Sequence, residues 1–142
     1  MKGLILHCKN FKFKDIENST KPDGIAEVIT DRVLTEGSFE NKVVILACIE
    51  EPDDEHIIYK ALQHINHMID EWHHGNKQVI VLPFGHLSRN IAKPPKSKEL
   101  IHLFVESLKK TGKNVELITF GSHKEWMVDV YGYPRATSWF EF

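Results

Sequence analysis

Two uninterrupted apolar segments constrain the fold of this chain more than any other feature. Residues 43–49 read VVILACI and residues 79–84 read VIVLPF, with no charged residue in either run. Apolar runs of this length without alternation are typical of strands that are buried on both faces of a sheet. Between them, apolar residues recur at steps of three and four from residue 57 to residue 72, which predicts an amphipathic helix. Strand, helix and strand in this order predict an α/β fold.

Shorter segments complete the predicted pattern. A second helix is predicted to begin at Pro94 and Pro95 and to end before Gly112. Residues 17–24 are rich in turn formers and predict a loop, whereas residues 25–34 fit a helix or a strand equally well. Further strands are predicted at residues 3–8, 11–14, 115–120 and 126–131, the last two joined as a hairpin through residues 121–125. We therefore expect a single domain over residues 1–142, a mixed β-sheet with two main helices.

Composition excludes several classes of protein. The chain has 142 residues, 42% of them hydrophobic, which is typical of one globular domain. No apolar run approaches the roughly 20 residues that span a bilayer, and the first one is too short for a signal peptide, so we expect a cytosolic protein without a membrane segment. Cys8 and Cys48 lie inside apolar segments and predict buried thiols.

Nine histidines raise the question of a metal site. His64, His67, His73 and His74 belong to the first helix or its end, and we expect them on its flank or in solvent, because other residues supply the apolar face. None stands at zinc-ligand spacing with a cysteine or carboxylate. The sequence predicts no metal and no cofactor.

Charge is distributed unevenly along the chain. Residues 1–75 carry 8 basic and 14 acidic side chains, net −6, whereas residues 76–142 carry 10 basic and 6 acidic, net +4. The basic residues concentrate between residues 89 and 113, and we expect five of them to lie on turns that face solvent: Lys93, Lys96, Lys98, Lys109 and Lys110. This stretch is either a solvated helix face or a surface that contacts phosphates. Its members are Arg89, Lys93, Lys96, Lys98, Lys109, Lys110 and Lys113.

Polar residues follow three of the predicted strands, where the ligand crevice of an α/β sheet usually lies. They are Glu50–Glu51, residues 85–88 and residues 121–124. His86 fits either a loop histidine that bonds nearby carbonyls or an acid–base group. Ser88 lacks the GxSxG frame of a nucleophile, which favours a helix-capping role. The residues alone leave Lys124 as a solvated lysine on a turn.

Two longer segments resemble a known family. VLPFGHLS at residues 81–88, followed by IAKP at residues 91–94, resembles the YPFAHLSSxLAKP block of the N-terminal editing domain of archaeal threonyl-tRNA synthetases. FGSHK at residues 120–124, followed by GYP at residues 132–134, is similar to that family's PFGYYKAF…KGHP block, and LILH at residues 4–7 to its LLIH start. The resemblance spans nearly the whole chain and keeps the order of the elements.

The resemblance implies the fold of D-aminoacyl-tRNA deacylases and the removal of serine mischarged on threonine tRNA. Water would attack the ester with help from the ribose hydroxyl of the substrate, so no protein nucleophile is needed. Lys124 and His86 occupy the family's lysine and histidine positions and are implied to be catalytic. Substrate binding is implied for Ile49, Pro83, Phe84, Gly85, Phe120, Gly121, Ser122 and His123. The implied partners are the acceptor end of threonine tRNA, an aminoacylation domain in cis or in trans, and a second copy in a homodimer.

The chain also departs from the family pattern, and two other functions stay open. His123 stands where an aromatic residue is common, Thr137 where a glutamate is common, and Cys8-Lys9-Asn10 replaces the start of the pattern. One alternative is a general D-aminoacyl-tRNA deacylase. The other is a catalytically decayed module that docks tRNA or assists assembly, which His123 and Thr137 favour.

Overall fold

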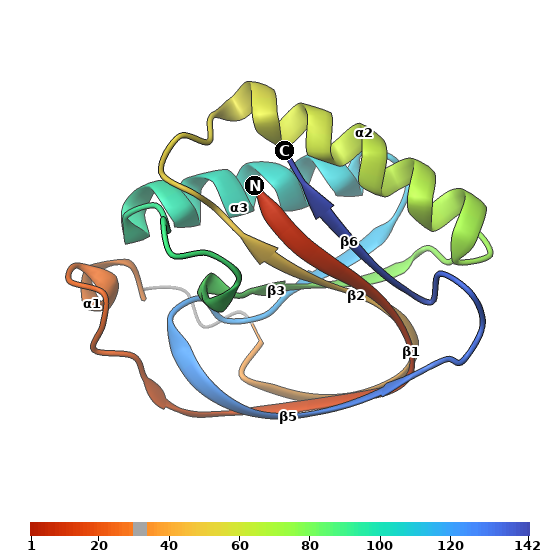
Figure 1. Ribbon diagram of the computed structural model, residues 1–142. Helices are drawn as coiled ribbons and strands as arrows, with labels where there is room; N and C mark the ends of the chain where they lie inside the picture. Colours follow the sequence, from red (N-terminus) through yellow and green to blue (C-terminus); the bar gives the residue numbers. More distant parts are fainter. Residues whose placement is uncertain (30–33) are drawn as a thin grey trace.

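Two long helices lie side by side on one face of a curved sheet in the computed structural model, which describes residues 1–29 and 34–142 (Figure 1). The larger part of the predicted segment 25–34 is therefore described, and residues 30–33 lie outside the described part. The helices are α1 (Ile25–Val28), α2 (Glu55–Trp72) and α3 (Pro94–Lys109), with a single 3₁₀ turn, η1, at Gly85–Leu87. The strands are β1 (Lys2–Asn18), β2 (Glu36–Cys48), β3 (Gln78–Pro83), β4 (Asn114–Leu117), β5 (Ser122–Val130) and β6 (Thr137–Glu141).

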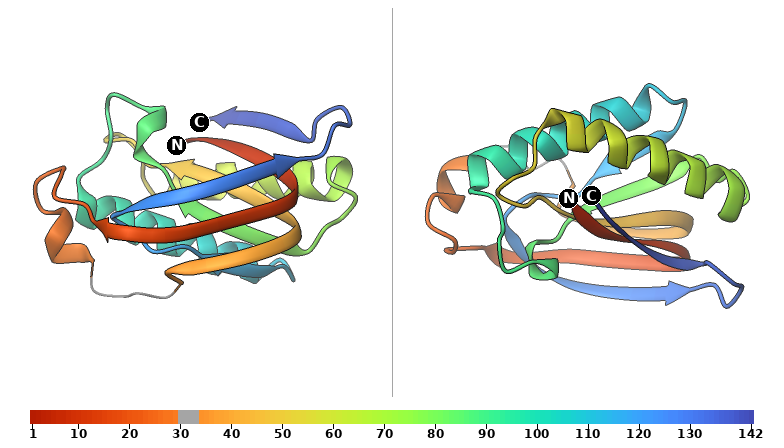
Figure 2. Two further views of the ribbon diagram at one scale, coloured as in Figure 1. Left: turned by 90° about the horizontal axis from the view of Figure 1, so that it is seen from below. Right: turned by 45° about the horizontal axis from the view of Figure 1, so that its top comes forward.

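The six strands form one mixed sheet, as predicted, in the order β4-β3-β2-β1-β5, with β6 also paired to β1. Strands β2, β3 and β4 are parallel to one another, whereas β1 is antiparallel to β2, β5 and β6. β6 pairs with the first part of β1 and β5 with the rest, so the two follow each other along one side of β1 (Figure 2). None of the helices in the described ranges is long and apolar enough to cross a membrane.

The prediction of a hairpin through residues 121–125 is wrong, because β4 and β5 lie at opposite edges of the sheet and do not pair with each other. After β4, the backbone N–H of Ile118 donates to Val81 and that of Thr119 to Leu34, which carries the chain across the sheet end. β5 then pairs with the second half of β1 from Cys8 to Asn18. That pairing covers backbone groups of β1 that would otherwise form an open edge.

Two further strand predictions also change. The strands predicted at residues 3–8 and 11–14 are parts of the single strand β1, and β6 was not predicted at all. In β6 only Phe140 is buried, and Trp139 is exposed. One buried side chain in five gives no periodic signal that sequence reasoning detects.

The core is divided by the sheet into two clusters. The larger lies between the helices and the sheet and includes the predicted apolar face of α2, with Ile58, Ile65 and Ile69 fully buried. The smaller lies on the other face, where Phe11, Phe13 and Phe39 stack with ring centroids 6.0–6.5 Å apart. Both faces of β2 and β3 are therefore covered, which explains their unbroken apolar sequences.

A buried histidine pair joins the end of α2 to the segment before β6. His73 is fully buried, contrary to the prediction of a solvent or flank position, and its ring stacks on His7 at 5.4 Å between centroids. Its Nε2 donates to the carbonyl of Arg135 at 3.0 Å, while the buried Nδ1 has no partner among the described residues. His7 donates from Nε2 to Asn41 Oδ1 at 2.9 Å, and its Nδ1 accepts from the hydroxyl of Tyr133.

This pair predicts loss of stability in mild acid. Burial lowers the pKa of both His73 and His7 below the usual value for histidine. The unfolded chain therefore binds protons that the folded chain excludes, and stability decreases as the pH falls below about 6.5, the ordinary pKa of histidine. Urea unfolding between pH 5 and 7.5 should show the midpoint decreasing below that value.

His73→Gln should weaken this pH dependence, although the variant itself is less stable. His67→Gln is the matched control, since His67 lies on α2, which His73 directly follows, and is exposed. A midpoint that does not change between pH 7.5 and 5 in the wild-type chain would contradict the prediction.

Candidate active site

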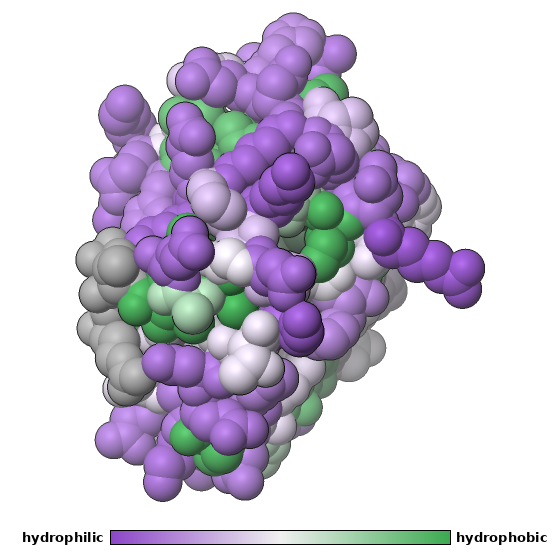
Figure 3. Space-filling model, turned by 90° about the vertical axis from the view of Figure 1, so that its left-hand side faces the viewer, coloured by the Kyte–Doolittle hydropathy of each residue, from purple (hydrophilic) through white to green (hydrophobic). Residues whose placement is uncertain are grey.

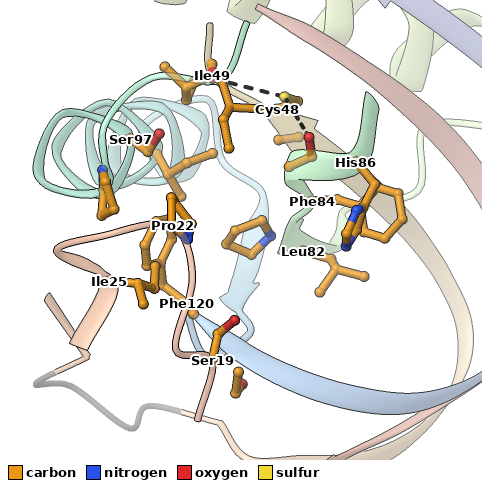
Figure 4. A pocket seen from close by; sticks show the side chains of 18 of the residues that line it. Ser19, Pro22, Ile25, Cys48, Ile49, Leu82, Phe84, His86, Ser97 and Phe120 are labelled. Carbon is orange, nitrogen blue, oxygen red and sulfur yellow. Dashed lines mark hydrogen bonds between the residues drawn. The ribbon is translucent and has the colours of Figure 1, made fainter. Parts of the chain in front are cut away.

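A cavity of about 920 Å³ opens at the end of the sheet where β2 and β3 end and β5 begins, beside the start of α3 (Figure 4). The face at this end is mainly hydrophilic, with hydrophobic side chains visible in hollows between the polar ones (Figure 3). The ten residues for which the family resemblance implies catalysis or substrate binding all line the cavity. They are Ile49, Pro83, Phe84, Gly85, His86, Phe120, Gly121, Ser122, His123 and Lys124.

Parallel pairing brings the first two segments together. Ala47 of β2 is the register partner of Pro83 of β3, so the residues that follow both strands emerge side by side. The N–H of Phe84 then donates to the carbonyl of Ala47 at 2.8 Å, which fixes the chain as it leaves β3. The polar strand ends therefore meet at one edge, as the crevice rule for α/β sheets requires.

The turn after β3 presents His86 to the cavity. His86 is exposed, and its ring lies 5.3 Å from that of Phe84, which also lies 5.7 Å from the ring of Trp126. Ser88 does not cap the following helix, contrary to prediction. Its hydroxyl donates to Glu50 Oε1 at 2.5 Å and accepts from the N–H of Asn90, so it ties the turn to the end of β2.

The predicted loop at residues 17–24, together with Ile25 directly after it, supplies another wall of the cavity. Ser19, Pro22 and Ile25 line it, and the N–H of Ser19 donates to the carbonyl of Gly121 at 2.8 Å. Gly121 has φ +77°, and a Cβ there would lie 2.9 Å from a side-chain carbon of Ile29. Glycine is therefore required at this crossing of two segments. The apolar residue Ile25, directly after a polar segment, was the one sequence feature that could have indicated that this segment packs against the site.

Lys124 is held inside the protein rather than solvated on a turn. Its Nζ donates to the carbonyls of Thr119 at 2.8 Å and Ser122 at 3.1 Å, and to the hydroxyl of Ser122 at 2.5 Å. Asp15 Oδ1 lies 3.4 Å away and forms an ion pair with it. Burial lowers the pKa of Lys124, and the charge of Asp15 opposes that effect.

The cavity thus offers main-chain groups and one buried cation. Cys48 also lines it, but burial raises the pKa of its thiol, which keeps the sulfur protonated and a poor nucleophile. Among residues 1–29 and 34–142, no group of three or more histidine, cysteine or carboxylate side chains is placed to hold a metal ion. This arrangement suits the binding and polarisation of a carbonyl compound.

The exposed residues of the basic stretch lie at the two ends of α3. Arg89 and Lys93 are exposed beside residues that line the cavity, while Lys109 and Lys110 lie at the other end of the helix. Lys113 is buried against Asp70 at 3.0 Å, so it does not belong to an exposed basic surface. The remaining two donate to main-chain carbonyls, Lys96 to Glu51 and Lys98 to Val28.

Comparison of the fold finds solved structures that are similar over nearly the whole chain. A structure described as c-Myc DNA unwinding element binding protein aligns over 100% of this chain and 99% of its own, with a TM-score of 0.67 and 13% identity. A probable eukaryotic D-amino acid tRNA deacylase aligns over 98% and 97%, with a TM-score of 0.55 and 10% identity. These likenesses show the fold, and they confirm the predicted α/β architecture.

Sequence comparison gives the family. Threonine–tRNA ligase of Staphylothermus marinus is 32% identical over 138 residues, which are 96% of this chain and 21% of that protein. The threonine–tRNA ligase editing subunit of Saccharolobus solfataricus is 28% identical over 133 residues, 94% of this chain and 32% of that protein. The chain thus spans between a fifth and a third of the length of these relatives. The family model of the Archaea-specific editing domain of threonyl-tRNA synthetase matches residues 1–141, and this chain belongs to that family.

Proposed function

We propose that this chain removes serine from threonine tRNA by hydrolysing the aminoacyl ester within the cavity at the sheet end. The observation that carries the proposal is the convergence of three strand ends around one cavity, with the buried ammonium of Lys124 beside it. Membership of the editing-domain family supports the same activity.

Serine is a reasonable substrate on energetic grounds. It differs from threonine by one methyl group, and a synthetic site rejects the smaller analogue by only about 1–3 kcal/mol. A second, hydrolytic site is then needed for accuracy. A rigid cavity can select serine, because it admits the smaller seryl group and excludes the larger threonyl group by steric contact.

The size of the cavity suits more than an amino acid. At about 920 Å³ it lies near the upper end of small-molecule sites, roughly 300–1,000 Å³. A seryl group together with the terminal adenosine of tRNA is a ligand of that size class. The seryl group would contact the main chain of residues 83–85 and 120–122, with Ile49 beside it, and the exposed ring of His86 would seat the adenosine.

The reaction needs no protein nucleophile in this proposal. An aminoacyl ester is already activated, so a water molecule attacks the carbonyl carbon and the carbonyl oxygen becomes negative. The bond to the ribose oxygen then breaks, and the neighbouring ribose hydroxyl helps to pass the proton of the water to that leaving oxygen. The positive charge of Lys124 stabilises the developing oxyanion. No metal or cofactor takes part.

The partners follow from this substrate. The acceptor end of threonine tRNA would reach the cavity past Arg89 and Lys93, whose exposed charges suit phosphate contacts. An aminoacylation domain, in cis or in trans, would supply the mischarged tRNA, and a homodimer is the assembly that we expect.

The first test compares two esters on the same tRNA. The chain should hydrolyse Ser-tRNA(Thr) at least tenfold faster than Thr-tRNA(Thr), because the extra methyl group costs binding in a rigid site. Release of labelled amino acid under single-turnover conditions measures both rates. Equal rates, or faster cleavage of D-aminoacyl-tRNAs, would indicate a general deacylase, and no hydrolysis of any ester would indicate a docking module.

The second test concerns the tRNA surface. Arg89→Gln with Lys93→Gln should weaken tRNA binding and reduce the slope of log Kd against log salt by about 1–2, since each phosphate contact contributes nearly one unit. Filter binding at several salt concentrations measures both quantities.

Lys109→Gln with Lys110→Gln is the matched control for charge. These residues lie about 24 Å from the start of α3, at about 1.5 Å per residue over its 16 residues, and should leave the slope unchanged. The proposed tRNA surface is wrong if the two double variants behave alike.

A further inference from the structure

The ammonium of Lys124 has no donor left for a substrate. An ammonium carries three N–H donors. In this structure the three are directed to Thr119 O, Ser122 O and Ser122 Oγ. The side chain is only 9% exposed, so water does not compete for these positions. The stabilising charge is therefore near the cavity, but its hydrogen bonds are used within the protein.

The hydroxyl of Ser122 connects the Lys124 ammonium to the cavity. Residues two apart on a strand face the same side, which brings the Ser122 hydroxyl to 2.5 Å from Lys124 Nζ. Because the Ser122 oxygen accepts from the ammonium, its own proton points elsewhere, and it has no acceptor among the described residues. Ser122 lines the cavity. A hydroxyl that accepts from a cation is polarised and becomes a stronger donor.

Asp15 fixes the ammonium from the other side. It is the direct register partner of Lys124 across β1 and β5, and its Oδ1 lies 3.4 Å from Nζ. That oxygen is buried and accepts no hydrogen bond among the described residues. Asp15 lines a separate small cavity of about 230 Å³ and is not part of the large one. It can therefore position Lys124 without touching a ligand of the active site.

We infer that Lys124 acts on the ester through Ser122, whose hydroxyl is the donor to the developing oxyanion, while Asp15 is a positioning residue that holds the ammonium in place. The inference rests on the proposed function and names the group that touches the substrate. Ser122 donates a hydrogen bond only; the water molecule forms the new bond to the carbonyl carbon, and the ribose oxygen leaves with the proton.

Other charged groups near Lys124 do not replace Asp15. Glu125 and His123 flank it on β5, and Lys14 and Glu17 lie on the paired strand, all of them exposed. His86 lines the same cavity from η1. Burial lowers the pKa of Lys124 and Asp15 alone among these groups raises it, so removal of the Asp15 charge should lower the pKa further.

The kinetic test is a double-mutant cycle on the full chain with Ser-tRNA(Thr). Ser122→Ala and Lys124→Met should each reduce the single-turnover rate on the order of 10²–10³-fold, as the loss of an oxyanion donor does. The double variant should be no slower than the slower single variant, because either change alone already disables the pair of Lys124 and Ser122. Ser122→Thr should retain most of the rate. Losses that multiply, or an acyl group trapped on Ser122, would overturn the inference.

A second measurement does not depend on activity. NMR of the Lys124 side chain, labelled at the ε-carbon, should give a titration midpoint that is lower in Asp15→Asn than in the wild-type chain. Glu17→Gln, an exposed change on the same strand, should leave the midpoint unchanged. An unchanged midpoint in Asp15→Asn would overturn the role of Asp15 while wild-type hydrolysis persists, whereas a wild-type chain without hydrolysis would refute the proposed function itself.

Discussion

The backbone pairing of β1 is the constraint on which the rest of this structure depends. This strand of 17 residues pairs with β2 on one side and with both β6 and β5 on the other. It therefore fixes the register of three segments that are distant in sequence. The same pairing places Asp15 opposite Lys124 and closes the second core cluster over Phe11 and Phe13. A shift of one residue would turn all these side chains to the opposite face.

The position of the cavity follows from this arrangement. Parallel β2 and β3 end together. β5 begins beside the end of β1, and the strong bend of the paired strands β1 and β2 brings that end back towards the ends of β2 and β3 (Figure 1). Backbone groups at strand ends have no partners within the sheet, so they are available to a ligand. The ammonium of Lys124, which forms an ion pair with Asp15 at 3.4 Å, lies beside these groups.

The sequence predicted the parts of the fold that have a strong period. Residues 43–49 and 79–82, and the faces of α2 and α3, are buried as expected, whereas Pro83 and Phe84 are partly exposed at the cavity. The predicted hairpin was wrong because the partner of a strand depends on the whole sheet and not on the nearest strand in the sequence. β6 was not predicted because a segment with one buried side chain gives no local signal. The role of Asp15 was out of reach for the same reason: its partner is 109 positions away, and only the register of β1 with β5 brings them together. Likewise, His73 follows an amphipathic helix and appears solvated until the segment before β6 covers it. The candidate site residues were found as strand ends and by family resemblance, and they surround one cavity, while their individual roles stay predictions.

The central claim is that the ester is cleaved by water with the help of the substrate's own ribose, in a cavity that contributes charge and shape. The most direct measurement is the single-turnover hydrolysis of Ser-tRNA(Thr) whose terminal ribose lacks the hydroxyl next to the ester. The account predicts that this deoxy substrate binds normally and is cleaved at least 100-fold more slowly, about 3 kcal/mol of barrier at 1.4 kcal/mol per tenfold. Hydrolysis of the deoxy substrate at the rate of the unmodified one would contradict it and would require an attacking or proton-transferring group from the protein.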